Sequence, residues 1–203
     1  FLVHDSQNNL VLLGTTSSTD YPTSVGAYDS GFNGGWPNTP ANMWGYVFTN
    51  GTDIVLTKLD NFGALMNSTY IGGTDNEGLN ESLIFNYSDQ ARGEVYLDIN
   101  DNVYVTTSLW SCDFPVTNGS LVNNGAGCFT AQDAVVFKMN STLSSLLWST
   151  YLGGSLYDAG YSIRVSDQGK VFVCGGTNST DIVTTSGVLN SSLSGSWDGY
   201  IAS

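Results

Sequence analysis

An internal repeat constrains the fold of this chain more than any other feature of its sequence. The segment NSTYIGG, at residues 67–73, returns as WSTYLGG at residues 148–154. An apolar run that begins with Asp and ends with Lys precedes each copy, as DIVLTK at 53–58 and DAVVFK at 133–138. DGYIAS, at 198–203, is a degenerate third copy of this run. Because a fixed internal period is the signature of repeat architectures, we expect a chain of similar units.

A second set of repeats predicts β-hairpins. Each combines an extended stretch, a polar turn with Asn or Gly and an alternating apolar strand. The copies are HDSQNNLVLLGTT from His4, LDINDNVYVTTS from Leu97 and VSDQGKVFVCGGT from Val165. A loop of common pattern follows each hairpin. Its copies are STDYPTSVGAY from Ser18, SCDFPVTNGSL from Ser111 and STDIVTTSGVL from Ser179.

Each unit therefore has four predicted strands: the hairpin, the Asp-led strand and the strand that ends in Thr-Tyr-apolar-Gly-Gly. Four antiparallel strands per repeat form a β-propeller blade, so we predict an all-β fold with fewer than three blades, a partial propeller. The predicted units are residues 1–73, 74–154 and 155–203, and the last lacks its fourth strand. Insertions near 32–50 and 74–88 are expected to be loops that either contact a ligand or partner or pack on neighbouring blades.

These motifs resemble the SBBP β-propeller repeat. The pattern of that family includes a Thr-Tyr-Leu-Gly-Gly strand end, an Asp-Ala-Phe-Val-Ala-Lys strand, a Gly-Asn-Val-Tyr-Val strand and a Ser-x-Asp-Phe-Pro loop. The resemblance extends over nearly the whole chain, although the third unit is incomplete. It implies a propeller in a large extracellular or cell-surface protein, usually without an assigned catalytic activity.

Closure of the propeller requires more blades than this sequence supplies, since propellers typically have four to eight. We expect the other blades to come from a longer polypeptide of which these residues are a part. The alternative is that several subunits complete the ring by exchanging strands across exposed edges. In both cases the predicted partners are further blades.

Charge and cysteine content narrow the partners and the location. Eighteen acidic and five basic residues give a net charge of −13, which leaves few cations for binding a nucleic acid. The sequence contains no run of eighteen apolar residues, so it predicts no membrane-spanning helix. A possible disulfide between Cys112 and Cys128, the low Lys content and the family resemblance favour a secreted, extracellular or cell-surface protein. Cys174 lies in an apolar strand pattern and is expected to be a small core residue.

Residues that recur in every unit are interpreted as structural, because a catalytic group is normally needed only once. The third predicted strand begins with Asp53, Asp133 and Asp198, whose carboxylates can accept hydrogen bonds from turn N–H groups. The loop after the hairpin carries Asp20, Asp113 and Asp181. The repeat turns also contain the paired strand-end glycines Gly72, Gly73, Gly153 and Gly154.

Motifs for catalysis and metal binding are missing from the sequence. It has no G-x-S-x-G, H-E-x-x-H or P-loop motif, and His4 is its one histidine. A carbohydrate-active enzyme with paired carboxylates remains a less favoured alternative. No cofactor is expected; calcium stays open because the turns at 98–102 and 72–78 offer oxygen ligands, although neither has EF-hand spacing.

Aromatic residues in loops and several glycosylation motifs suggest surface contacts. Aromatic faces can stack on sugar rings or pack between blades, and the candidates for contact with a glycan or a partner are Trp36, Trp44, Tyr46 and Trp110. Asn-x-Ser/Thr occurs at Asn50, Asn67, Asn80, Asn86, Asn118, Asn140, Asn178 and Asn190.

The sequence hypothesis for function follows from the repeats. We expect a non-catalytic structural or adhesive propeller module of a larger surface protein or filament, which acts through protein–protein contacts. The alternative is a carbohydrate-binding module that uses the loop aromatics. Exposure of Trp36 and Trp44 around a groove would favour the alternative.

Overall fold

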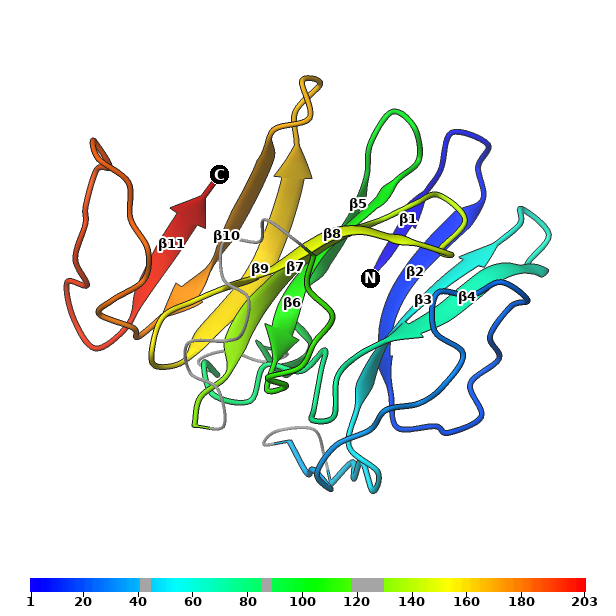
Figure 1. The fold of residues 1–203 in the computed structure, drawn as a ribbon, viewed down its shortest axis with the longest axis horizontal. Helices are drawn as coiled ribbons and strands as arrows, with labels where there is room; N and C mark the ends of the chain where they lie inside the picture. Colours follow the sequence, from blue (N-terminus) through cyan, green and yellow to red (C-terminus); the bar gives the residue numbers. More distant parts are fainter. Residues whose placement is uncertain (41–44, 85–88, 118–129) are drawn as a thin grey trace.

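A computed structural model describes residues 1–40, 45–84, 89–117 and 130–203 of the chain. The described strands form three antiparallel sheets, which we call blades 1, 2 and 3 (Figure 1). Blade 1 contains β1 (Leu2–His4), β2 (Leu10–Thr16), β3 (Asp53–Leu59) and β4 (Leu65–Ile71). Blade 2 contains β5 (Glu94–Leu97), β6 (Val103–Leu109), β7 (Asp133–Met139) and β8 (Leu146–Leu152). Blade 3 contains β9 (Asp158–Val165), β10 (Val171–Thr177) and β11 (Asp198–Ala202).

The strands of each blade are neighbours in chain order, so every blade is a simple meander. A short 3₁₀ helix, η1 (Asp89–Ala91), precedes blade 2. The predicted all-β fold of four-stranded antiparallel blades, with fewer than three complete blades, is confirmed. Blade 3 has three strands, and the described residues do not close a propeller.

Side chains at the hairpin turns explain why the chain reverses between the first two strands of a blade. Asp5 Oδ1 accepts hydrogen bonds from the backbone N–H groups of Gln7 (2.9 Å) and Asn9 (2.8 Å). Asn8 lies between them in the left-handed region, at φ 63°, a conformation that Asn tolerates better than most residues. In blade 2, Asp98 Oδ1 accepts bonds of 2.9 and 3.0 Å from Asn100 and Asn102.

The Lys that ends each Asp-led apolar run forms an ion pair with the turn of the same blade. Lys58 Nζ lies 2.8 Å from Asp5 Oδ2, and Lys138 Nζ lies 3.1 Å from Asp98 Oδ2. Burial alone would raise the pKa of Asp5. The hydrogen bonds from Lys58 and the turn outweigh burial and lower the pKa of Asp5 to about 2. The repeated Lys therefore ties the third strand of a blade to its first hairpin.

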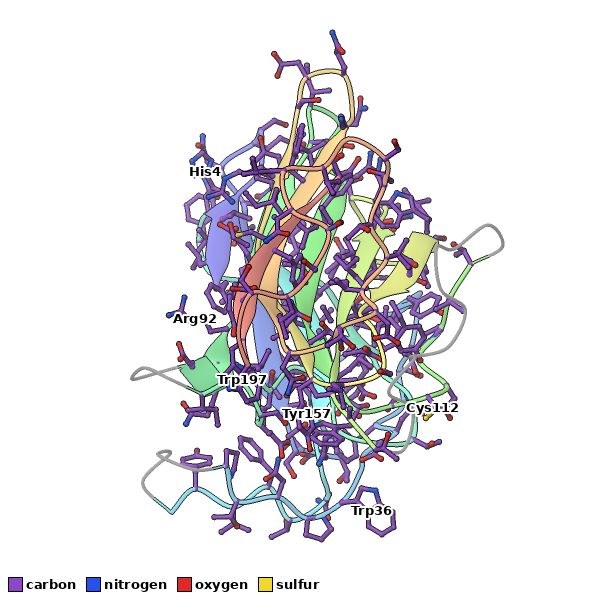
Figure 2. The ribbon with its side chains drawn as sticks, turned by 90° about the vertical axis from the view of Figure 1, so that its left-hand side faces the viewer. His4, Trp36, Arg92, Cys112, Tyr157 and Trp197 are labelled. Carbon is purple, nitrogen blue, oxygen red and sulfur yellow. The ribbon has the colours of Figure 1, made fainter. Side chains whose placement is uncertain are left out.

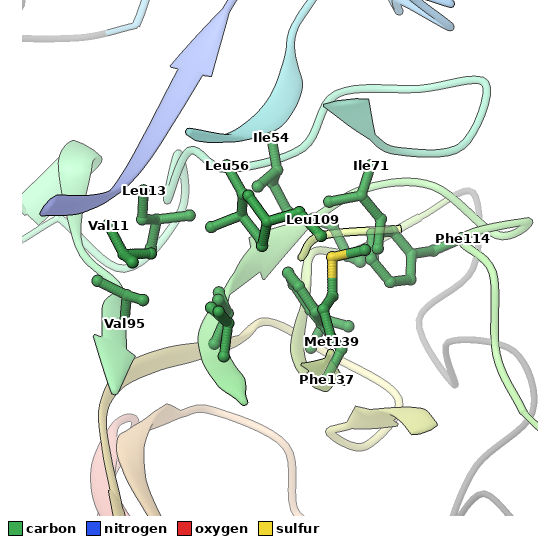
Figure 3. Packing of buried hydrophobic residues seen from close by; sticks show 14 of the residues in the cluster. Val11, Leu13, Ile54, Leu56, Ile71, Val95, Leu109, Phe114, Phe137 and Met139 are labelled. Atoms are coloured by element: carbon green, nitrogen blue, oxygen red, sulfur yellow. The ribbon is translucent and has the colours of Figure 1, made fainter. Parts of the chain in front are cut away.

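The main apolar cluster lies between blades 1 and 2 (Figure 3). Alternation along the strands sends every second side chain to the same face. Blade 1 contributes Val11, Leu13, Ile54, Leu56 and Ile71. Blade 2 and its loop contribute Val95, Val103, Val105, Leu109, Phe114, Val135, Phe137, Met139, Leu143 and Tyr151.

The opposite face of blade 2 packs against blade 3 through a second cluster. Tyr104, Ala134, Val136 and Leu152 meet Ile163, Val165 and Val173 there. Blade 2 is thus covered on both faces, and the three blades stand in chain order from blade 1 to blade 3 (Figure 1). Burial of these faces is the main source of stability of such a repeat array.

Candidate interaction sites

The junction between blades 1 and 2 is held by a polar contact, which we call the interblade latch. The Gly-Gly end of β4 continues to Thr74 and Asp75, and the loop after β6 carries Ser111 and Asp113. Asp113 Oδ1 accepts a hydrogen bond from Thr74 N (2.9 Å), and its Oδ2 accepts one from Thr74 Oγ1 (2.9 Å). Ser111 Oγ accepts a hydrogen bond from Asp75 N (2.9 Å). The strand end of one blade therefore docks on a loop of the next.

The junction between blades 2 and 3 repeats this latch. Asp181 Oδ1 accepts hydrogen bonds from Ser155 N (2.8 Å) and Ser155 Oγ (3.1 Å). Ser179 Oγ accepts a hydrogen bond from Leu156 N (2.9 Å). Because the same atoms engage at both junctions, the Ser-x-Asp loop acts as a receptor for the strand end of the preceding blade.

A tyrosine in each Thr-Tyr-apolar-Gly-Gly strand positions the Ser-x-Asp loop of its own blade. In blade 1 the Tyr70 hydroxyl donates to Ser18 O (2.8 Å) and accepts from Tyr21 N (2.8 Å). The same two bonds, of 2.9 and 3.0 Å, recur in blade 2 between Tyr151, Ser111 and Phe114. The loop is thus oriented from within its blade before it contacts the neighbouring one.

A buried acid lies at the centre of each latch, and sequence reasoning missed it. Glu77 Oε1 accepts hydrogen bonds from Gly73 N (3.1 Å) and from Ser111 Oγ. Its other oxygen, Glu77 Oε2, is buried without a hydrogen-bond partner in the described part of the chain. Burial, with smaller effects from nearby Asp53 and Asp113, holds the pKa of Glu77 well above its ordinary value.

Asp158 is the equivalent acid at the second junction. Its Oδ2 accepts hydrogen bonds of 2.7 Å from Gly154 N and from Ser179 Oγ, and burial raises its pKa. The sequence contains a signal for both acids, because three residues separate each Gly-Gly pair from an acidic residue. That spacing would have identified Glu77 and Asp158.

The paired glycines allow the close approach at each latch. A Cβ on Gly73 would collide with Asp113 Oδ1 and with the Ser111 side chain. A Cβ on Gly154 would collide in the same way with Asp181 and Ser179. The first glycines, Gly72 and Gly153, lie against pairs of buried carboxyl groups: Glu77 with Asp53, and Asp158 with Asp133.

Two of the Asp residues that begin the third strands, Asp53 and Asp198, accept hydrogen bonds from backbone groups of the preceding loops. Asp53 Oδ2 and Oδ1 accept hydrogen bonds from Asn33 N (2.7 Å) and Gly34 N (2.8 Å). Asp198 Oδ2 accepts one from Ser194 N (2.5 Å). Burial outweighs the hydrogen bonds at Asp53 and raises its pKa to about 6.

A groove of 340 Å³ lies beside the first latch and is built largely from the two insertions. It is lined by Trp36, Pro37, Asn38, Asp75, Asn76, Glu81 and Trp110. Trp36 is 71% exposed, and its Nε1–H donates to Asp75 Oδ2 (3.0 Å). Figure 2 shows Trp36 at the margin of the molecule, at the end opposite His4. Trp110 packs edge-on against Tyr157, with ring centroids 6.1 Å apart.

The other aromatic candidates do not share this groove. Tyr46 is 67% exposed, but its ring lies 5.7 Å from that of Phe48, and it is not among the residues that line the groove. Trp44 lies outside the described residues. The structure therefore brings Trp36 and Trp110 together and leaves Tyr46 apart from them.

The predicted glycosylation motifs differ in exposure. Asn50 and Asn190 are exposed, and Asn80 is completely buried, with its side chain bonded to Leu83 O and Asp89 O. A glycan on Asn80 is incompatible with this burial. The asparagines with intermediate exposure are Asn67, Asn140 and Asn178. Asn86 and Asn118 lie outside the described residues.

The cysteines fall into two states. Cys112 is disulfide-bonded, and Cys174 carries a free thiol. Cys128, the predicted partner of Cys112, lies outside the described residues. Cys174 is partly buried in β10, opposite Ser162 and Ile201.

The described residues contain neither a metal-ligand cluster nor a helix that could span a membrane. Among them, no group of three or more His, Cys, Asp or Glu side chains is arranged to hold a metal ion. That includes the described turns at 98–102 and 72–78, where the sequence left calcium open. No helix in the described part of the chain is long and apolar enough to cross a membrane.

Comparison with known proteins gives one family match. No curated protein matches this sequence. The SBBP family, described as a β-propeller repeat, matches residues 147–182. The matched segment runs from β8 through β9 and β10 to the Ser179 loop, and it therefore contains the complete second latch. The resemblance expected from the sequence is confirmed over this segment, where residues 147–182 match the SBBP β-propeller repeat.

Proposed function

We propose that this protein is a non-catalytic structural or adhesive propeller module of a larger extracellular surface protein or filament. It acts through protein–protein contacts that have the same form as its own blade junctions. The interblade latch carries this proposal. Two junctions use the same Ser-x-Asp receptor and the same Gly-Gly strand end, so the chain contains both halves of a repeated docking contact.

Blade 1 presents a third receptor of the same form. Ser18 and Asp20 occupy the positions of Ser111 and Asp113, and Tyr70 fixes the loop through Ser18 O. Both side chains are exposed, and Ser18 Oγ donates to Asp20 Oδ1 (3.2 Å). No strand end from the described residues occupies this receptor. Its chemistry fits the Gly-Gly-Ser/Thr end of another blade.

The opposite end of the array presents a strand edge. Within the described residues, β11 pairs with β10 alone. Ile201, the fourth of its five residues, is 84% exposed. A free edge offers unpaired N–H and C=O groups, which are a template for another strand. An added strand would give blade 3 the four strands that blades 1 and 2 have.

Sedimentation velocity over a range of protein concentrations tests this proposal. We expect concentration-dependent association of the chain that Asp20→Ala weakens at the receptor and Ile201→Lys weakens at the edge. Asp167→Ala is the matched control. Asp167 is exposed in the turn between β9 and β10, away in sequence from both the receptor and the β11 edge, and its substitution should leave association unchanged. A protein that stays monomeric at its solubility limit, or association that neither variant changes, would contradict the proposed contacts.

A further inference from the structure

The groove beside the first latch is formed mainly by residues outside the repeat pattern. Trp36, Pro37 and Asn38 belong to the insertion in blade 1, whereas Asp75, Asn76 and Glu81 belong to the insertion that follows it. Residues that recur in each blade maintain the blade and its junctions. Much of this groove recurs in no other unit, so the repeat architecture does not account for it.

Trp36 has the properties of a stacking platform. Its side chain is largely exposed, yet the hydrogen bond from Nε1 to Asp75 Oδ2 (3.0 Å) fixes the orientation of the ring. Exposure of a large aromatic ring to water is unfavourable unless another surface covers it. A ring that is oriented in advance loses little conformational entropy when a ligand binds.

Polar groups next to this platform are held in place by the fold. Glu81 Oε1 accepts a hydrogen bond from Asn38 Nδ2, and Glu81 N donates to Gln132 Oε1 (2.7 Å). The other oxygen, Glu81 Oε2, has no hydrogen-bond partner among the described residues. Asn76 Oδ1 accepts a bond from Thr52 N (3.0 Å), which fixes that side chain as well. The groove therefore combines an aromatic surface with preorganised acceptors for hydroxyl groups.

Trp110 adds a second aromatic side chain to the lining. Its backbone N–H donates to Asn76 O (2.8 Å), which joins it to the insertion. Its Nε1–H is buried and donates no hydrogen bond within the described residues. Buried donors normally have an acceptor, so this orphaned group in the groove lining is a second, independent sign of an unfilled contact.

We propose that this groove binds a neutral pyranose sugar of a glycan. One apolar face of the sugar would stack on Trp36, and its hydroxyls would donate to Glu81 and Asp75. The volume of 340 Å³ lies at the lower end of the ~300–1,000 Å³ range of small-ligand pockets, which suits a mono- or disaccharide. The two carboxyl groups and the net charge of −13 disfavour acidic sugars.

The proposed site is separate from the free receptor and the free edge that carry the proposed function. Trp36 and Glu81 take no part in the latch at either junction, and Ser18, Asp20 and Ile201 do not line the groove. Loss of sugar binding and loss of association are therefore measured with different variants and are distinguishable.

Binding is tested by saturation-transfer NMR and Trp fluorescence titration of the chain. The probes are methyl glycosides of glucose, galactose, mannose and N-acetylglucosamine, together with lactose, glucuronic acid and tetramethylammonium. We expect at least one neutral sugar to bind and the charged probes not to. Trp36→Ala should weaken binding at least tenfold, and Trp36→Phe should weaken it less. Tyr46→Ala, an exposed aromatic of the same insertion outside the groove, should have no effect.

Far-UV circular dichroism and urea unfolding of each variant separate loss of binding from loss of fold. Three results would overturn the proposal: no neutral sugar binds; Tyr46→Ala weakens binding as much as Trp36→Ala; or the tetramethylammonium or acidic probe binds more tightly than every neutral sugar. Glu81→Gln keeps an oxygen for Asn38 but removes the charge, so it should change which sugar is preferred rather than unfold the protein.

Discussion

Asp113 accepts two hydrogen bonds from Thr74, one from its backbone N and one from its side-chain hydroxyl, across the junction between two blades. Thr74 directly follows the Gly-Gly end of blade 1, whereas Asp113 lies in a loop of blade 2, which shows that a recurring Asp serves the neighbouring blade as well as its own loop. The segment matched by the SBBP family, residues 147–182, contains both sides of the equivalent contact at the second junction. The matched segment thus includes a junction as well as strands.

The first prediction concerns the strength of the latch. Asp113→Ala should lower the free energy of unfolding by about 1 kcal/mol, because it removes two charge-assisted hydrogen bonds at a solvent-exposed position. Asp20→Ala is the control, since Asp20 is equivalent in sequence but, within the described part of the chain, its side chain accepts a hydrogen bond only from Ser18, and it should change stability by less than about 0.5 kcal/mol. Urea unfolding of the chain measures both. Equal effects of the two substitutions would argue against the latch as a stabilising contact.

The second prediction concerns the ion pair within blade 1. Lys58→Met should destabilise the protein by about 3 kcal/mol, since it leaves the buried carboxylate of Asp5 without its cation. Arg164→Met removes an exposed cation from Glu94 and should cost less than about 1 kcal/mol. Chemical denaturation at pH 7 provides the comparison. If Lys58→Met cost no more than Arg164→Met, the ion pair would be dispensable for the blade.

A third prediction follows from the opposite pKa shifts of the carboxyl groups. Burial raises the pKa of Asp53 to about 6 and, aided by nearby Asp75, raises the pKa of Glu81 to about 7. The folded state holds these protons more tightly than the unfolded state, whose pKa values are 3.8 and 4.5. Their contribution to stability is therefore complete below pH 4 and is lost as the pH rises through 6 and 7.

Asp5 and Asp98 have the reverse effect, because hydrogen bonds and Lys partners lower their pKa values to about 2 despite burial. Their contribution is present above pH 3.8 and is lost as the pH falls toward 2. The free energy of unfolding should therefore peak between pH 4 and 5 and decrease toward pH 7.5. Urea unfolding across this range measures the profile, and Glu81→Gln should flatten its neutral limb. A maximum at or above pH 7 would contradict the assigned shifts.

Much of the fold could be predicted because the repeat encodes it locally. The Asp-led run, the hairpin and the Thr-Tyr-apolar-Gly-Gly strand each carry the alternation of a β-strand, and together they give the four strands of a blade. From the sequence, the Lys at the end of the Asp-led run marked only where the apolar stretch stops. Its ion pair with the hairpin turn depends on strand pairing that brings Lys58 and Asp5 together.

The contacts between blades were harder to predict, because they join the strand end of one blade to a loop of the next that is distant in the sequence. Asp113 was recognised as recurrent, but its partner Thr74 lies 39 positions away and on another blade. The groove was only partly foreseen. Trp36 and Trp110 were candidates on the basis of residue type, whereas Glu81 and Asn38 have no recurring motif, and only the packing of two insertions places them beside Trp36.

The last prediction concerns the glycines at the blade junctions. Gly154→Ala should destabilise the protein strongly, because the added Cβ would overlap Asp181 Oδ1 and the Ser179 side chain and force the second latch apart. Gly195→Ala is the matched control: a Cβ there meets nothing, and its backbone is not left-handed. Thermal unfolding should show a drop in Tm for Gly154→Ala of roughly 4–8 °C, which corresponds to about 2 kcal/mol in a chain of this size. Gly195→Ala should leave Tm unchanged or raise it slightly, since alanine reduces the freedom of the unfolded chain.

The double substitution Gly154→Ala with Asp181→Ala separates the steric cause from a loss of backbone freedom. Removal of the Asp181 side chain relieves part of the collision, so the double variant should be less destabilised than the sum of the two single variants. Strict additivity would mean that the added Cβ does not act through the Asp181 side chain. A double variant that is destabilised by about 1 kcal/mol less than the sum of the two single variants would instead establish that the strand end and the Ser-x-Asp loop must approach closely for neighbouring blades to pack.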